Sequence, residues 1–230
     1  MSFPKTTERF VAYFDIMGFK DLIYRHDHSV VSNLLDRVSA NVADIKEWEG
    51  ELLEKRSKIK KRNIHKGIVL PVMFSDSVIF ISRSNSVWDA RKTIYVASYF
   101  LYNMFSTCVP VRGAIAYGIF TADFKASKFF GRPLVDAYIL SEETNFYGAV
   151  LHHSIEDRLH VCNEITPENI IKRMPVPMKA GLVTHSFVDW RSWLDDSINF
   201  HSIMEPFYRS VSGSTRRYVD NTLSIYGEEP

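Results

Sequence analysis

A short hairpin in the first half of the chain limits the folds that this sequence can adopt. Two apolar runs, residues 68–74 and 78–81, are separated only by Ser75, Asp76 and Ser77. That spacing and those turn-forming residues are typical of two antiparallel strands joined by a tight turn. The chain therefore builds a sheet, and the elements before and after the hairpin decide its kind.

Elements of both types surround the hairpin. Residues 10–14 are aromatic and β-branched and end at Asp15, which is typical of a central strand. Apolar residues recur at helical spacing on either side of the hairpin. The predicted elements, in order, are a strand over 10–14, helices over 19–24 and from residue 29, the hairpin, a helix over 87–105 and a strand over 109–117. This order predicts an α+β fold with a ferredoxin-like βαββαβ core and its helices on one sheet face.

The rest of the chain gives a weaker signal, and Pro175 and Pro177 indicate loops within it. Its predicted elements are a helix over 131–142, a strand over 178–188 and helices over 200–211 and 214–223. The 230 residues contain no repeat, low-complexity tract or flexible linker. We therefore predict a single domain over 1–230, with its core over about 10–142 and an α/β extension over about 143–230.

Composition excludes several classes of protein. The chain is 46% hydrophobic and 24% charged, which excludes a disordered chain and a collagen-like repeat. Its formal net charge of +1 provides no overall field for attracting nucleic acid or a membrane, so we expect neither as a stable partner. Residues 55–66 are rich in Lys and Arg; we interpret them as a solvated loop, with a grip for a triphosphate or a regulatory RNA as the alternative.

The cysteines and the N-terminus indicate a location inside the cell. Cys108 and Cys162 lie far apart and form no CxxC pattern, which fits a reducing compartment and excludes a thiolate zinc site. The N-terminal residues are polar and lack the apolar core of a signal peptide. Residues 93–111 carry no formal charge, but polar side chains and Pro110 interrupt them, so they predict a buried helix followed by a strand. We predict a cytoplasmic protein.

Asp15 is the first candidate functional residue. It follows a buried strand and precedes Gly18 and the start of a helix. One interpretation is a helix N-cap or an Asx turn, because an Asp oxygen accepts a free backbone N–H at such a place. The other is a ligand to a divalent cation beside phosphate-binding amides, to which Gly18 would give a ligand close access.

Asp76, at the tip of the hairpin, favours the second interpretation. In a βαββαβ sheet the first strand neighbours the hairpin, so Asp15 and Asp76 are expected to meet. Two carboxylates at one sheet end suit Mg²⁺ or Mn²⁺, which take hard oxygen ligands together with substrate phosphates. A pair of ions held this way catalyses phosphoryl transfer, because one ion activates the attacking hydroxyl and the other neutralises the leaving pyrophosphate.

Four short motifs, in the right order, resemble those of the class III nucleotidyl cyclase catalytic domain. Residues 14–19 (FDIMGF) resemble the FxDIxGF motif of that family, and residues 74–77 (FSDS) resemble its second metal-aspartate hairpin. Residues 111–118 (VRGAIAYG) are similar to its RxGxxxG strand, and residues 131–138 (GRPLVDAY) to the helix that begins GxxV. The closest similarity is to the pyrimidine cyclases of bacterial Pycsar anti-phage systems, which also read FDIxGF and AYxL.

The resemblance implies the chemistry of the site. Asp15 and Asp76, with Ile16 as a further contact, would bind two Mg²⁺ or Mn²⁺ ions. The substrate would be a nucleoside triphosphate, which is cyclised with release of pyrophosphate. Its contacts in the turn would come from Phe14, Ile16, Met17, Gly18 and Phe19. The resemblance also implies a homodimer with active sites at the subunit interface.

The positions at which purine cyclases read the base differ here. Val72 stands where the family usually has Lys or Glu, and Lys128 stands where it usually has Asp or a small polar residue. A pyrimidine is smaller and presents a different hydrogen-bonding edge, so losing a purine reader is chemically consistent with it. We expect conversion of UTP or CTP to cyclic UMP or cyclic CMP in anti-phage defence, with UTP favoured. A purine cyclase with a rearranged base pocket is the alternative.

A second departure concerns the transition state. The cyclase helix usually presents Asn and Arg one turn apart, where this chain has Val135 and Ile139. Those groups orient the ribose and neutralise charge on the transferring phosphate. Arg112 and Arg132 are the candidates for the missing catalytic cation, with a solvated surface arginine as the alternative for either. Lacking such a cation, the chain would be a degenerate cyclase fold that binds nucleotide and signals by dimerising.

Overall fold

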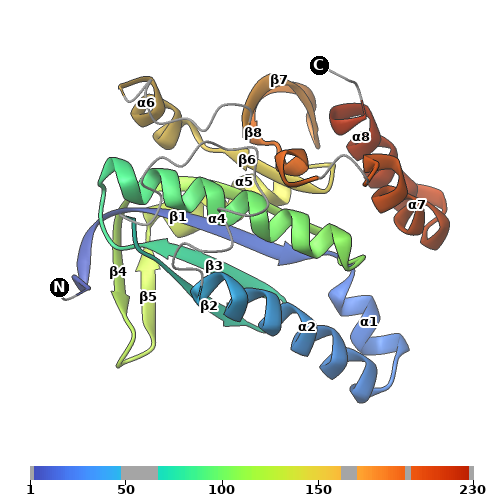
Figure 1. Cartoon of the computed structure of the whole chain (residues 1–230), viewed down its shortest axis with the longest axis horizontal. Helices are drawn as coiled ribbons and strands as arrows, with labels where there is room; N and C mark the ends of the chain where they lie inside the picture. Colours follow the sequence, from blue (N-terminus) through green and yellow to red (C-terminus); the bar gives the residue numbers. More distant parts are fainter. Residues whose placement is uncertain (1–2, 48–66, 162–169, 195–197, 228–230) are drawn as a thin grey trace.

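Eight strands form one sheet in the part of the chain that the computed structural model describes, which is residues 3–47, 67–161, 170–194 and 198–227 (Figure 1). The strands are β1 (Thr6–Ile16), β2 (Val69–Phe74), β3 (Ser77–Ser82), β4 (Val111–Asp123), β5 (Lys128–Gly131), β6 (Gly148–Leu151), β7 (Ile171–Met178) and β8 (Gly181–Val188). Their order across the sheet is β2-β3-β1-β4-β6-β8-β7, and β5 pairs with β4.

Helices pack around this sheet. They are α1 (Phe19–Arg25), α2 (His28–Glu47), α4 (Val87–Ser106), α5 (Arg132–Glu143), α6 (His153–Val161), α7 (Phe200–Ser210) and α8 (Arg216–Tyr226). The α4 helix begins with a side-chain cap, because the Ser86 hydroxyl accepts from the backbone N–H of Asp89. Short 3-10 turns follow β8 and precede α8, over Trp190–Trp193 and Gly213–Thr215.

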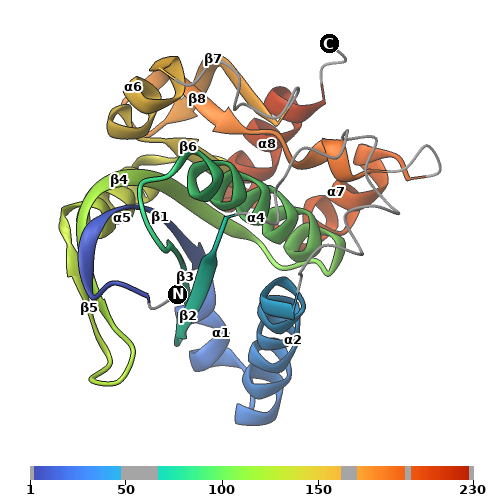
Figure 2. The same cartoon turned by 60° about the vertical axis from the view of Figure 1, so that its left-hand side comes forward.

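The side chains of β1 alternate between two apolar layers. Phe14 points to one face, where its ring centre lies 4.8 Å from that of Phe100 on α4. Tyr13 points to the other face, where its ring meets that of Tyr138 on α5 edge-on at 5.6 Å. Because successive residues of a strand point to opposite faces, α4 and α5 cover opposite sides of the sheet (Figure 2).

The predicted α+β fold and its βαββαβ core are confirmed. β1 pairs antiparallel with both β3 and β4, and β2 pairs antiparallel with β3 at the edge of the sheet. α2 packs against α4 and β2, so the two crossover helices lie on one face, as predicted. α5 follows this core and packs against β1 and β4 on the other face.

Three strands extend the sheet beyond β4, and of these the sequence pattern predicted β8, as the strand over 178–188. β6 is parallel to β4, and β8 and β7 follow it. Pro175 and Pro177 lie inside β7 and not in a loop, which the sheet tolerates because β7 is its outermost strand. The predicted C-terminal helices are α7 and α8, and the buried Tyr226 hydroxyl of α8 donates to the carbonyl oxygen of Val188 over 2.9 Å.

The uncharged residues 93–111 divide between a helix and a strand, as predicted: α4 ends at Ser106 and β4 begins at Val111. In the described ranges, no helix combines the length and the apolar character needed to cross a membrane. The basic residues 55–66 and Cys162 lie outside the described residues.

Candidate active site

Asp15 and Asp76 lie at the same end of the sheet. Asp15 is the second-last residue of β1 and pairs with Ser77, which directly follows Asp76 in the chain. The backbone N–H of Ile16 donates to the carbonyl oxygen of Asp76 over 3.0 Å. The structure therefore brings together the two aspartates that the sequence predicted as metal ligands.

The Asp15 carboxylate is partly buried, with 20% of its side chain exposed. Burial raises the pKa of Asp15, Arg112 opposes that rise, and the negative charge of Asp76 adds to it. The folded chain thus holds a proton on Asp15 more readily than the unfolded chain does. The resulting stability is present at acid pH and is lost as the pH rises through the raised pKa of Asp15. A cation bound between the two carboxylates would remove this penalty.

A row of side chains across four strands surrounds Asp15. Phe74 on β2 pairs with Ser77 on β3, and Ser77 pairs with Asp15. On its other side, Asp15 pairs with Arg112 on β4. Residues that pair directly point to the same face of a sheet, so all four share the face of Asp15. Phe74 is 81% exposed, which leaves the β2 end of this row open.

A second row lies one step further into the sheet on the same face. Val72 pairs with Ile79, and Ile79 pairs with Tyr13. The Tyr13 hydroxyl oxygen lies 3.0 Å from the Ser77 hydroxyl oxygen, which connects the two rows. Burial raises the pKa of Tyr13, the hydrogen bond with Ser77 lowers it, and the charges of the two aspartates raise it. The phenol therefore stays protonated at neutral pH.

Arg112 is the cation beside the aspartates. Its Nη2 lies 3.4 Å from Asp15 Oδ2, and the same nitrogen pairs with the Glu142 carboxylate at the end of α5. Its Nε is buried and has no hydrogen-bond partner among the described residues. The Nε–H is therefore a buried donor that no acceptor in the described part of the chain satisfies. Glu142 was not predicted from the sequence, since nothing in the local pattern of α5 reveals that this residue pairs with an arginine of β4.

The turn between β1 and α1 offers backbone groups. Gly18 adopts a φ of 78°, in the left-handed region that favours glycine. The N–H groups of Ile16 and Met17 already donate to carbonyl oxygens, that of Met17 to Pro110 over 2.9 Å. In the described part of the chain, the amides of Gly18 and Phe19 have no such partner. These two amides, and not the whole turn, therefore have N–H groups available to a further acceptor.

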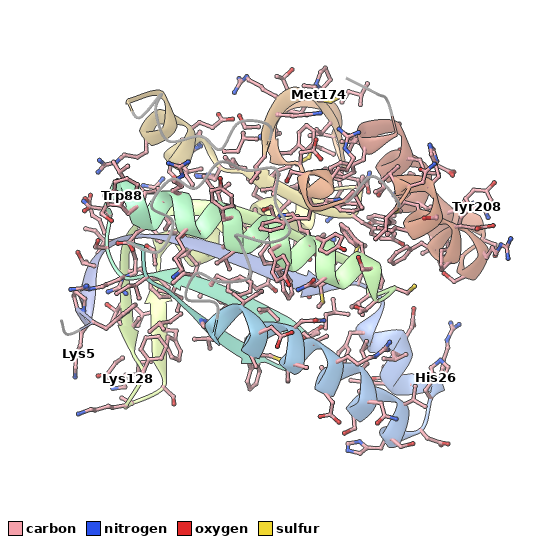
Figure 3. All side chains as sticks on the ribbon, viewed as in Figure 1. Lys5, His26, Trp88, Lys128, Met174 and Tyr208 are labelled. Atoms are coloured by element: carbon pink, nitrogen blue, oxygen red, sulfur yellow. The ribbon has the colours of Figure 1, made fainter. Side chains whose placement is uncertain are left out.

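Three predicted site residues lie elsewhere. Phe14 is fully buried against α4, so its side chain faces away from the aspartates. Lys128 lies at the end of the β4–β5 hairpin that is remote from α1 (Figure 3). Arg132 is the first residue of α5, and the second residue of that helix packs near Gly118 on β4. Gly118 is six residues from Arg112, which is roughly 20 Å along the strand at about 3.3 Å per residue. Within one chain these residues do not reach the aspartates.

The donor set fits Mg²⁺ or Mn²⁺. Asp15 and Asp76 offer hard carboxylate oxygens, and the buried, apolar Ile16 has only its carbonyl oxygen to add. Among the described residues there is no cluster of three or more His, Cys, Asp or Glu side chains that would hold a metal by itself. The remaining ligands would be waters and substrate phosphates, which is the usual coordination of Mg²⁺ at phosphoryl-transfer sites.

Solved guanylyl cyclase structures share this fold at low sequence identity, although no family model and no curated protein matches the chain. One is the catalytic core of a rhodopsin-guanylyl cyclase with converted specificity in complex with ATPαS, with TM-score 0.57, 13% identity, and coverage of 80% of this chain and 98% of that chain. Another is a dimeric guanylyl cyclase domain of the RhoGC fusion protein from the aquatic fungus Blastocladiella emersonii, with TM-score 0.55, 12% identity, and coverage of 80% and 96%. The guanylyl cyclase Cya2 has TM-score 0.51, 11% identity, and coverage of 80% and 91%. The chain therefore has the α+β fold of these catalytic domains.

Proposed function

We propose that the chain is a metal-dependent nucleotide cyclase that converts a nucleoside triphosphate to a cyclic nucleotide and pyrophosphate. The observation that carries this proposal is the convergence of Asp15 and Asp76 at one end of a sheet with the fold of guanylyl cyclase catalytic domains. Two divalent ions bound there would activate the ribose 3′-hydroxyl for attack on the α-phosphorus and neutralise charge on the leaving pyrophosphate.

Side chains and amides of the chain would position the reactants around that centre. Asp15 and Asp76 fix the place of the ions, and the Gly18 amide donates to phosphate oxygens. Arg112 supplies positive charge directly beside Asp15, where its guanidinium would stabilise charge on the transferring phosphate. We therefore propose Arg112 as the transition-state cation that a chain supplies beside its own aspartates, since Arg132 lies at the other end of α5 within that chain.

We further propose a pyrimidine nucleoside triphosphate as the substrate, with UTP favoured over CTP. Val72 lies on the face of the aspartates and packs against a small apolar cluster that includes Val11 and Phe120. It presents an apolar surface at a position where purine cyclases carry a hydrogen-bonding base reader. The product would then be a second messenger in anti-phage defence, as the sequence resemblance implies.

Purified protein is expected to convert UTP or CTP at least about tenfold faster than ATP or GTP in the presence of Mn²⁺. The assay incubates each of the four triphosphates separately and measures both pyrophosphate and cyclic nucleotide. Product from ATP or GTP alone would contradict the pyrimidine assignment and leave the cyclase intact. Binding of nucleotide without pyrophosphate release would contradict the proposed activity and identify a degenerate dimerisation module.

An exposed apolar face on α5 supports the proposed homodimer. Val135, Tyr138 and Ile139 recur at helical spacing and are each about half exposed. Grouped exposed apolar side chains are typical of protein interfaces, and a two-fold axis would bring the same face of two copies together.

The substitution Ile139→Glu is expected to convert the dimer to a monomer and to lower turnover at least about tenfold, because it buries a carboxylate without a partner in the interface. Light scattering after size-exclusion chromatography measures the change in mass. Leu182→Glu is the matched control, since it places the same charge on an exposed apolar residue of β8. A dimer that persists in Ile139→Glu, or a wild-type monomer with full activity, would contradict the proposed interface.

A further inference from the structure

A cleft of about 740 Å³ lies outside the site described above. Its walls come from the middle of β4, the first turns of α5 and the first turns of α6, which packs beside β4 (Figure 2). The β4 wall contains Tyr117 and Ile119, which lie five and seven residues along the strand from Arg112. At about 3.3 Å per residue, this part of the cleft lies roughly 17–23 Å along β4 from Arg112, which pairs with Asp15.

The cleft is lined by nitrogen-bearing side chains. The Arg132 side chain is 80% exposed, and its ion-pair partner among the described residues is Asp136, 3.3 Å away. Arg158 lies over the Tyr117 ring at 4.6 Å and 3.5 Å from the Glu8 carboxylate. The rings of His152 and His153 complete this side; their centres lie 3.9 Å apart and their planes are inclined by 43°.

Two guanidinium groups and two imidazole rings of the cleft can contact an anion, and Asp136 and Glu8 are the carboxylates beside the two guanidinium groups. Burial lowers the pKa of His152, and the neighbouring His153, Arg132 and His185 also lower it, while Asp136 opposes them. The nearby groups that disfavour a positive charge on His152 thus outnumber the single carboxylate. A negatively charged group would meet two guanidinium groups here, one of which is mostly exposed to solvent.

The size and the apolar part of the cleft indicate more than a simple ion. Small-molecule sites usually enclose about 300–1,000 Å³, and the cleft falls within that range. Ile119 is 65% exposed along one wall, and the Tyr117 ring lies beside it. These groups offer an apolar surface next to the charged one, as a phosphate attached to a flat organic group requires.

We propose that this cleft is a second ligand site, which binds a small organic phosphate of mononucleotide size. The phosphate lies against Arg132, Arg158 and His153, and the organic group lies against Tyr117 and Ile119. The site is independent of the proposed catalytic centre and requires no divalent ion, because its positive charge comes from the chain itself.

Isothermal titration calorimetry in EDTA tests this site with UMP, AMP, inorganic phosphate and uridine as probes. UMP or AMP is expected to bind, with uridine and inorganic phosphate each at least about tenfold weaker, since each probe lacks one half of the ligand. Arg158→Gln is expected to weaken nucleotide binding about tenfold or more. Arg209→Gln, which removes an exposed, ion-paired arginine from α7, is the matched control and leaves binding unchanged.

Two further variants test whether the nucleotide binds in the cleft or at the proposed catalytic site. His153→Ala weakens binding if the site is correct and replaces Arg158→Gln should that variant fail to fold by circular dichroism. Asp76→Asn leaves binding in EDTA unchanged, because the proposed catalytic site depends on metal and this site does not. The proposal is overturned if neither nucleotide binds, if inorganic phosphate binds as tightly as UMP, or if binding is lost in Asp76→Asn and retained in the cleft variants. None of these results depends on whether the protein is a cyclase.

Discussion

The substitution Asp76→Asn is expected to lower Mn²⁺-dependent cyclase turnover by about a thousandfold or more, while the free energy of unfolding changes little. Asparagine has nearly the same shape as aspartate, and the backbone carbonyl oxygen of residue 76 still accepts from the Ile16 N–H. What the substitution removes is one of two carboxylates that converge at the end of β1. A single carboxylate, already bonded to Arg112, is a poor site for two divalent ions.

Folding and metal binding can be measured separately from turnover. Thermal denaturation with and without Mn²⁺ is expected to show stabilisation of the wild type by the ion and little or none in Asp76→Asn. Asp44→Asn, which removes an exposed carboxylate from α2, is the control for net charge and should behave as the wild type in both assays. Wild-type turnover in Asp76→Asn would contradict the metal site on which the proposed function rests.

The part of the site that the sequence predicted correctly depends on strong local patterns. The β1 strand and the β2–β3 hairpin have apolar runs and turn residues that admit few other structures, and the order of elements then places Asp15 next to Asp76. The roles of neighbouring side chains depend instead on pairing register and on helix direction. Ser77 and Tyr13 illustrate this, because their contact across two strands has no local sequence signal.

The direction of α5 explains why Arg132 lies far from the aspartates of its own chain. The helix start was expected beside the aspartates, whereas α5 begins near Gly118 and its end lies near Arg112. Its last full turn therefore supplies Glu142 to the site, and its first turn supplies Arg132 to the cleft. No pattern within the helix distinguishes these two directions, since both bury the same apolar side.

The elements that the sequence failed to predict are short or atypical. β5 and β6 contain four residues each, too few for a period to emerge, and β7 contains two prolines. Prolines exclude a central strand but not an edge strand, so the correct prediction required knowing that β7 ends the sheet. In β5, β6 and β7 the local sequence does not favour a strand, and pairing with neighbouring strands determines the structure.

The substitution Arg112→Gln is expected to lower turnover by about a hundredfold to a thousandfold, the loss typical of removing one transition-state donor. Among the described residues, Arg112 is the cation whose contact with Asp15 places it directly beside the aspartates. The substitution also removes the group that opposes the raised pKa of Asp15, so that pKa rises further. Because a metal ion competes with the proton for this carboxylate, the acid limb of the activity profile is expected to move to higher pH.

The substitution Glu142→Gln separates catalysis by Arg112 from the structural role of its ion pair. This substitution weakens the ion pair between Glu142 and Arg112 by removing the charge of Glu142, and it keeps the Arg112 guanidinium. Turnover is therefore expected to change by less than about tenfold. Equal losses in Arg112→Gln and Glu142→Gln would show that the ion pair only holds the end of α5 against β4. A large loss in Arg112→Gln alone, at a pH well above its shifted acid limb, would locate the effect in the transition state, because Asp15 is then ionised in both proteins.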